Sequence, residues 1–344
     1  MTIFRRIPGE LVVAAVGTVA IVLLPFVLGS TQEFYFAFVG CYFIAALGLQ
    51  ILTGYAGQIS LGHSGFMMIG AYTTLILSLD HGWNEFATVP VGGLVAGVAG
   101  FLFGFPALRL RGVYLALATF AIPIALTGFV KKFPTHTGGG SGRPFNEVLT
   151  GFEAYVRVWP FAGVLFVLAW LVLRGRTGRA FRTVRESEIA AVSSGINLAL
   201  TKTFAFGISA FYAGIGGSLY GITIGFVNPT PFDIALSILL LVGVVVGGLG
   251  SISCVIFGAL FIEYVPLYAP QILEHVEKPF GLHLDPKAAG APAAVYGAIL
   301  LLVLFLMPSG VAGLLRAALR FVDRRFKLGS TDVAPQLTST RREA

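Results

Sequence analysis

Long apolar runs, separated by short polar segments, repeat along most of the chain. A helix needs about 20 apolar residues to cross the hydrocarbon core of a bilayer, and nine runs come close to this length. They cover residues 11–29, 34–52, 88–108, 112–130, 157–173, 204–225, 234–250, 252–269 and 291–307. A tenth segment, 60–79, has a more polar start and is either a full span or a partly re-entrant one. The pattern predicts an all-α, polytopic transmembrane helix bundle of about ten spans.

The basic residues test this count independently, because cytoplasmic loops are enriched in Lys and Arg. With ten spans and a cytoplasmic N-terminus, 17 of the 23 basic residues fall inside and six fall outside. Omitting the 60–79 span would move the Arg-rich segment 174–203 to the outer side. We therefore predict ten spans with both the N- and C-termini cytoplasmic.

The segments between the spans divide the chain further. Residues 1–315 form the predicted transmembrane domain, with a cytoplasmic segment at 174–203 and outer loops at 131–156 and 270–290. The glycine-rich run 135–142 in the first outer loop predicts a flexible loop. Residues 316–344 are predicted to be a basic, partly disordered cytoplasmic tail.

Composition agrees with a membrane protein and excludes several function classes. Hydrophobic residues make up 56% of the chain and charged residues 11%, whereas soluble domains carry about 25% charged residues. The net charge of +7 comes from basic residues placed between apolar runs, so it indicates membrane orientation rather than nucleic-acid binding. The sequence shows no P-loop, catalytic triad or metal-spaced His and Cys cluster. The chain is therefore predicted to be non-catalytic, without a metal or a cofactor of its own.

The cytoplasmic segment 174–203 contains a predicted amphipathic helix from Thr183 to Ser194, ended by Gly195. A short helix held between two spans suits docking into a groove of a partner protein. It equally suits a position against anionic lipid. Its predicted apolar side consists of Val184, Ile189, Ala191 and Val192, and its solvated side of Arg185, Glu186 and Glu188.

A second polar stretch, 54–65, contains four glycines and leads into the 60–79 segment. Inside a membrane, non-helical backbone is tolerated where protein or a water-filled cavity covers it. The stretch is therefore either a break that faces a translocation path or a cytoplasmic turn that leads into a close helix contact. In the first case, a helix N-terminus there would favour an anionic group such as a substrate carboxylate. The path candidates are Gly57, Gln58, Ser60, His63 and Ser64, with Tyr114 and Thr119 of the 112–130 span.

For Tyr114 and Thr119, ordinary helix packing is the competing interpretation. Glu263 is the one acidic residue well inside a predicted span, where an ionisable side chain is a functional candidate by default. Because Pro266 follows near the predicted outer end of that helix, we expect Glu263 to reach the outer interface.

Five motifs, in order across residues 35 to 310, resemble permeases of ABC importers. The run Glu188-Ile189-Ala190-Ala191, followed by Gly195, resembles the "EAA…G" helix that docks on the ATPase subunit in that superfamily. Four others resemble the LivM-type permeases of branched-chain amino acid importers. They are LTGYAGQISLGHSGF at 52–66, LRLRGVY at 108–114, TGGGSG at 137–142 and VGGLGS at 246–251. Ser187 and the run 192–194 depart from the more acidic or alanine-rich pattern of the relatives.

The resemblance implies a permease subunit in a bacterial inner (plasma) membrane. Its implied partners are a second LivH-type permease, two cytoplasmic ABC ATPases that bind the ATP, a periplasmic solute-binding protein and the lipid bilayer. The implied substrates are branched-chain or related amino acids, with urea, other amides and aromatic acids as alternatives. The implied ATPase-coupling residues are Arg185, Glu186, Glu188, Ala190, Ala191 and Gly195.

Two other classes compete with this interpretation. An ion-coupled secondary transporter of small polar solutes usually needs intramembrane ionisable residues, and this chain offers Glu263 and His63. A membrane-embedded enzyme would need clustered acids or histidines at one membrane face, which the sequence does not show. Co-purification of an ATPase distinguishes the importer from both.

Overall fold

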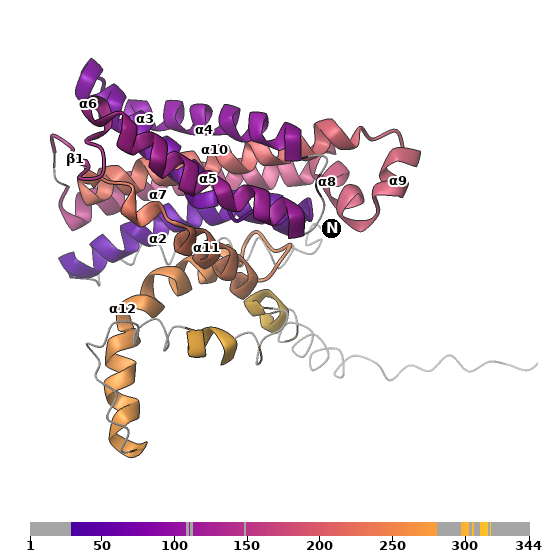
Figure 1. The fold of residues 1–344 in the computed structure, drawn as a ribbon. Coiled ribbons are helices and arrows are strands. Elements are labelled where there is room, and N and C mark those ends of the chain that lie inside the picture. Colours follow the sequence, from indigo (N-terminus) through magenta and orange to yellow (C-terminus); the bar gives the residue numbers. More distant parts are fainter. Residues whose placement is uncertain are drawn as a thin grey trace, which may run out of the picture.

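The computed structural model describes residues 29–107, 110, 113–147, 149–280, 297–302, 305, 310–315 and 317. In this part of the chain the secondary structure is helical apart from one pair of two-residue strands. Most of the long helices lie side by side as a bundle (Figure 1). Residues 11–28 of the first predicted span and nearly all of the tail 316–344 lie outside the described residues.

The long helices follow the predicted spans. Most predicted boundaries are right to within a few residues, and α7 (Gly151–Arg174) begins six residues early because Thr150 caps it. The Thr150 hydroxyl accepts from the Glu153 N–H (3.3 Å), and the Glu153 carboxylate accepts from the Thr150 N–H (3.0 Å), which is a capping box. The helices are α2 (Ser30–Leu49) with its π-helical continuation η2 (Gln50–Tyr55), α3 (His63–His81), α4 (Glu85–Ala107), α5 (Val113–Lys132), α6 (Pro134–Thr137), α7 (Gly151–Arg174), α8 (Arg176–Glu186), α9 (Glu188–Ser193), α10 (Leu198–Ile224), η3 (Thr230–Phe232), α11 (Ile234–Gly247) and α12 (Val255–Phe280).

Five of the described helical stretches are long and apolar enough to cross a membrane, judged by length and composition. They are Ser30–Tyr55, Glu85–Phe105, Tyr114–Lys132, Gly151–Arg174 and Leu198–Ile224, and Ile234–Gly247 and Val255–Tyr268 are shorter apolar helices. This confirms a mostly helical, polytopic membrane protein. The count of ten spans and the cytoplasmic position of the termini stay predictions.

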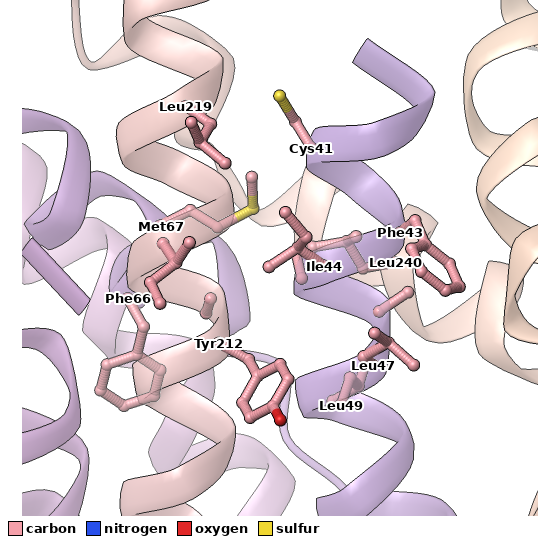
Figure 2. Close-up of a cluster of buried hydrophobic side chains, with 14 of the residues drawn as sticks. Cys41, Phe43, Ile44, Leu47, Leu49, Phe66, Met67, Tyr212, Leu219 and Leu240 are labelled. Carbon is pink, nitrogen blue, oxygen red and sulfur yellow. The ribbon is translucent and has the colours of Figure 1, made fainter. Parts of the chain in front are cut away.

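The helix α10 lies at the centre of the bundle and packs against α4, α3 and α2. Small residues bring these backbones close together, since a Cβ added at Gly70 would collide with the backbone of Gly214. Such contacts are typical of helix packing in membranes. Figure 2 shows the buried apolar side chains around α10, among them Ile44 of α2, Met67 of α3 and Leu240 of α11.

The segments between the helices gather at two ends of the bundle (Figure 1). At one end, β1 (Arg143–Pro144) pairs with β2 (Phe226–Val227) and joins two of the predicted outer segments. Asp80, at the end of α3, accepts from Arg143 (2.9 Å) and from His136 (2.8 Å) at the same end. At the other end, the loop 56–62 lies against α8. The predicted inner segments thus lie together, and so do the predicted outer ones.

Two expectations for the outer segments need correction. The run 135–142, expected to be flexible, is a folded turn in which the Thr137 hydroxyl is buried and donates to the carbonyls of Val130 and Phe133 (both 2.8 Å). The predicted outer loop 270–290 starts inside a helix, because α12 continues to Phe280. Residues 281–290 lie outside the described part of the chain.

Candidate functional site: the junction of two sequence motifs

The segment 174–203, which we call the coupling segment after its predicted role, contains the two short helices α8 and α9, so the prediction of one continuous helix from Thr183 to Ser194 was wrong. α8 ends at Glu186, and Ser187 has an extended backbone (φ −159°, ψ 117°). The Ser187 hydroxyl accepts from the N–H of Ala190 (3.2 Å) and caps α9. Serine competes with the helix backbone in this way and favours N-cap positions. Gly195 follows α9 with φ +77°, the left-handed conformation that ends a helix.

The four residues of the predicted apolar side do not all face the same way. Val184 and Ala191 are buried against the body of the protein. Ile189 is 81% exposed and Val192 57% exposed, so these two residues form what we call the α9 apolar face. Ala190, one of the predicted coupling residues, is also exposed on α9. The segment therefore presents apolar surface away from the bundle.

The charged residues among the predicted coupling residues also differ in their exposure. Arg185 and Glu186 are exposed, as expected for the solvated side. Glu188 differs from that expectation, because its carboxylate accepts from Nζ of Lys202 (2.6 Å). This ion pair ties the start of α9 to the first turn and a half of α10. Lys202 was not among the predicted coupling residues, although its charge, opposite to that of Glu188, was a signal in the sequence.

The glycine-rich stretch packs directly on the coupling segment. Gly57 has φ +72°, and a Cβ added there would lie only 2.9 Å from Cγ of Arg185. The Arg185 guanidinium also donates to the carbonyl of Gly54. Gly57 and Gln58 line a cavity of about 210 Å³ together with Arg185, Glu186 and Glu188. Two motifs that lie far apart in the sequence thus form one junction.

The other path candidates of this stretch are buried in helix contacts within the chain. The side chains of Ser60, His63 and Ser64 are fully buried. Nε2 of His63 donates to the carbonyl of Ala45 (2.9 Å). Oγ of Ser64 lies 2.7 Å from Oγ of Ser237. These bonds attach the start of α3 to α2 and α11, as the close-contact interpretation of the stretch expects.

Thr119 and Tyr114, the two path candidates of α5, lie in different surroundings. Thr119 is buried, and its hydroxyl accepts from the N–H of Leu61 (2.9 Å), two residues before α3 begins. Tyr114 is 72% exposed. Five helical residues separate the two side chains by about 140° around the helix, which places them on different faces.

Glu263 lies in the first half of α12, and not near the end of a helix as expected. α12 continues through Pro266 to Phe280. The Glu263 side chain is partly buried and lies within electrostatic reach of Tyr42 and Tyr220. Among the described residues, no group of three or more His, Cys, Asp or Glu is arranged to hold a metal ion.

Comparisons with known proteins add to this geometry. Residues 33–308 match the family described as the permease component of branched-chain amino acid transport systems. The high-affinity branched-chain amino acid transport system permease protein LivM of Escherichia coli is 35% identical over 252 residues, which are 64% of this chain and 59% of that protein. The corresponding LivH protein of Escherichia coli is 25% identical over 296 residues, 79% of this chain and 91% of LivH.

A more distant relative is the probable LivM permease of Methanocaldococcus jannaschii, 23% identical over 313 residues, 79% of this chain and 90% of that protein. The chain thus spans 59% of the length of the LivM relative of Escherichia coli. No solved structure matches the chain.

Proposed function

The chain belongs to the permease family of branched-chain amino acid transport systems, and from this premise we propose that it is a transmembrane subunit of an ABC importer for branched-chain or related amino acids. A permease component of this kind is not itself a catalyst. In the proposal it forms the translocation path with a second, LivH-type permease in a bacterial inner membrane. Two separate ATPase subunits hydrolyse ATP on the cytoplasmic side, and a periplasmic binding protein delivers the solute.

The observation that supports this function best is the contact of Arg185 with the glycine-rich stretch. Arg185 packs on Gly57 and donates to Gly54, so movement of α8 reaches the loop before α3 directly. The Glu188–Lys202 ion pair connects α9 to α10 at the same time. Because α10 packs against α2, α3 and α4, a force applied at α9 reaches the centre of the bundle.

The partner that applies this force would bind the α9 apolar face. α9 lies at the tip of the bundle, at the end opposite to β1 (Figure 1), and Ile189 and Val192 are exposed there. Exposed apolar side chains on a short helix suit docking into a groove. An ATPase that binds this face differently with and without ATP would shift the equilibrium between two conformations of the permease.

The same proposal changes the ranking of the path candidates. A path formed between two permeases is lined by residues that are exposed on each separate subunit. Tyr114 meets this condition. Ser60, His63, Ser64 and Thr119 are buried within the chain, so we assign them to holding the start of α3, which borders the junction.

The experiment that tests the proposal is the substitution Ile189→Asp in the tagged chain, expressed with the genes of its proposed partners. An acid at the second position of α9 is favourable for the helix itself, so helix loss does not complicate the result. We expect the variant to insert into the membrane and to lose both its co-purified ATPases and ATP-driven amino acid uptake. Mass spectrometry of the purified complex identifies the subunits.

Asn197→Asp is the matched control, because it adds the same charge to the same segment without disturbing a helix. Asn197 caps the start of α10 by accepting from the N–H of Leu200 (3.1 Å), a position that Asn and Asp fill equally well, and we expect its variant to keep the ATPases. Normal uptake by an assembled Ile189→Asp complex would refute the docking role of α9. If the wild-type chain purifies as a stable homodimer without ATPases, the importer proposal fails.

The homodimer result would instead favour an ion-coupled secondary transporter of small polar solutes. Glu263 and His63 would then be the first residues to substitute. Within the importer proposal, urea, other amides and aromatic acids are the alternative substrates. Uptake assays with the purified binding protein and each solute class distinguish them.

A further inference from the structure

A second and larger cavity lies beside the junction, between the end of α7, α8 and η2. Its volume is about 780 Å³. Four arginines line it, Arg174, Arg179, Arg182 and Arg185, together with the aromatic residues Trp170 and Tyr55. We propose that this arginine pocket binds the phosphate group of an anionic phospholipid.

The charges of the pocket are not balanced within the described residues. Four guanidinium groups line it with one carboxylate, that of Glu186. The ion pairs found in the described part of the chain, Asp80 with His136 and Arg143, and Glu188 with Lys202, include none of these arginines.

The arginines are held instead by neutral groups. Arg182 donates to the carbonyl of Leu173 (2.9 Å) and lies over the ring of Tyr55, 5.4 Å from its centroid. Arg174 lies 3.9 Å from the ring centroid of Trp170. These contacts orient the guanidinium groups and leave their positive charge available. Guanidinium groups bind phosphate oxygens with paired, charge-assisted hydrogen bonds.

The surface next to the pocket favours a lipid over a soluble phosphate compound. α7 is long and apolar enough to cross a membrane. Its exposed apolar side chains, Val164, Val167, Leu168 and Leu171, lie on one face at helical spacing. This face leads to Arg174 at the pocket, one turn further along.

Trp170 lies near Arg174 at the same end of α7. Aromatic residues are common at this position in membrane helices, where the membrane meets water. A lipid bound here would place its phosphate among the arginines and its acyl chains along α7. Arg185 belongs both to the pocket and to the junction with Gly54. The bound lipid would therefore brace α8 against α7, whichever substrate the protein carries.

The test measures binding of phosphatidylglycerol to the full chain, purified with its partners in a non-ionic detergent, by native mass spectrometry. Arg179→Gln removes one charge from the pocket. Arg176→Gln is the matched control, because it removes the same charge from an exposed residue of the same helix that does not line the pocket. One arginine near anionic lipid contributes about a fivefold factor to the affinity. We therefore expect Arg179→Gln to bind phosphatidylglycerol about fivefold more weakly, and Arg176→Gln to bind it within twofold of the wild type.

Three outcomes would overturn the proposal. Unchanged phosphatidylglycerol binding by Arg179→Gln would show that the pocket is not the site. Equal losses in Arg179→Gln and Arg176→Gln would show that only the overall surface charge matters. If glycerol 3-phosphate competes with phosphatidylglycerol at equal concentration, the site takes soluble phosphate compounds and the lipid assignment is wrong. The measurement does not involve transport, so its failure would leave the proposed function standing.

Discussion

At the residue scale, two features of the structure require a glycine at position 57. Its φ of +72° is strained for any residue with a Cβ, and a Cβ there would press on Arg185 at 2.9 Å. Gly57→Ala therefore strains the backbone and displaces α8 from the loop before α3. Under the proposed function, we expect this variant to insert normally and to lose most of the ATP-driven uptake, measured in vesicles reconstituted with the partner subunits.

Gly82→Ala is the control for backbone strain alone. Gly82 has φ +69°, and no atom lies within 4 Å of a Cβ added there. A left-handed backbone costs a residue with a Cβ about 1–2 kcal/mol, so both variants carry a similar backbone cost and only the Gly57 variant also disturbs Arg185. Uptake should fall in the Gly57 variant only. Equal uptake in the two variants would contradict a coupling role for the contact between Gly57 and Arg185.

At the scale of elements, a pair of serines connects the start of α3 to α11. Ser237 Oγ accepts from the N–H of Ser64 (2.9 Å) and also contacts Ser64 Oγ. The N–H of Ser64, in the first turn of its helix, has no intrahelical partner. Ser237→Ala leaves this donor buried and unsatisfied, at a cost of about 1–3 kcal/mol.

Ser64→Ala is the matched comparison, because it removes one hydroxyl and keeps the bond from the N–H of residue 64 to Ser237. Its expected cost is smaller, about 0.5–1.5 kcal/mol. Thermal unfolding in detergent should therefore rank the wild type first, Ser64→Ala second and Ser237→Ala third. The reverse order of the two variants would mean that the N–H of Ser64 finds another partner.

At the scale of the whole molecule, Arg143 joins three parts of the end that is opposite to α8 and α9. Its guanidinium donates to Asp80 (2.9 Å) and to the carbonyl of His136 (2.8 Å), and its backbone pairs with Val227. Arg143→Gln should loosen this end. An exposed ion pair contributes about 0.2–1 kcal/mol, so amide hydrogen exchange in residues 134–145 should become up to about fivefold faster.

Lys132→Gln supplies the control for that experiment. Lys132 is exposed on the same segment and forms none of the ion pairs found among the described residues. We expect its variant to exchange like the wild type. Equally fast exchange in both variants would mean that loss of positive charge, and not loss of the Arg143 contacts, loosens the loop.

The sequence by itself determined the membrane helices and the grouping of the loops. Partition of a segment into lipid depends on the summed polarity of about 20 neighbouring residues, so local composition suffices. The predicted spans between 34 and 269 accordingly coincide with helices, and loops predicted for the same side touch one another. Short-range capping can also be read from the sequence, because Ser187 directly before Glu188 is a typical N-cap and marks the break between α8 and α9.

Only the tertiary structure decided which polar residues meet. Arg185 and Gly54 are 131 residues apart, and nothing local to either predicts their contact. The same holds for Thr119, which is buried against the start of α3, and Tyr114, which is exposed. The physical reason is that lipid tails are as apolar as a protein interior. The hydrophobic pattern of a membrane helix therefore shows little of which face packs on protein. That face is determined by the packing of the whole bundle.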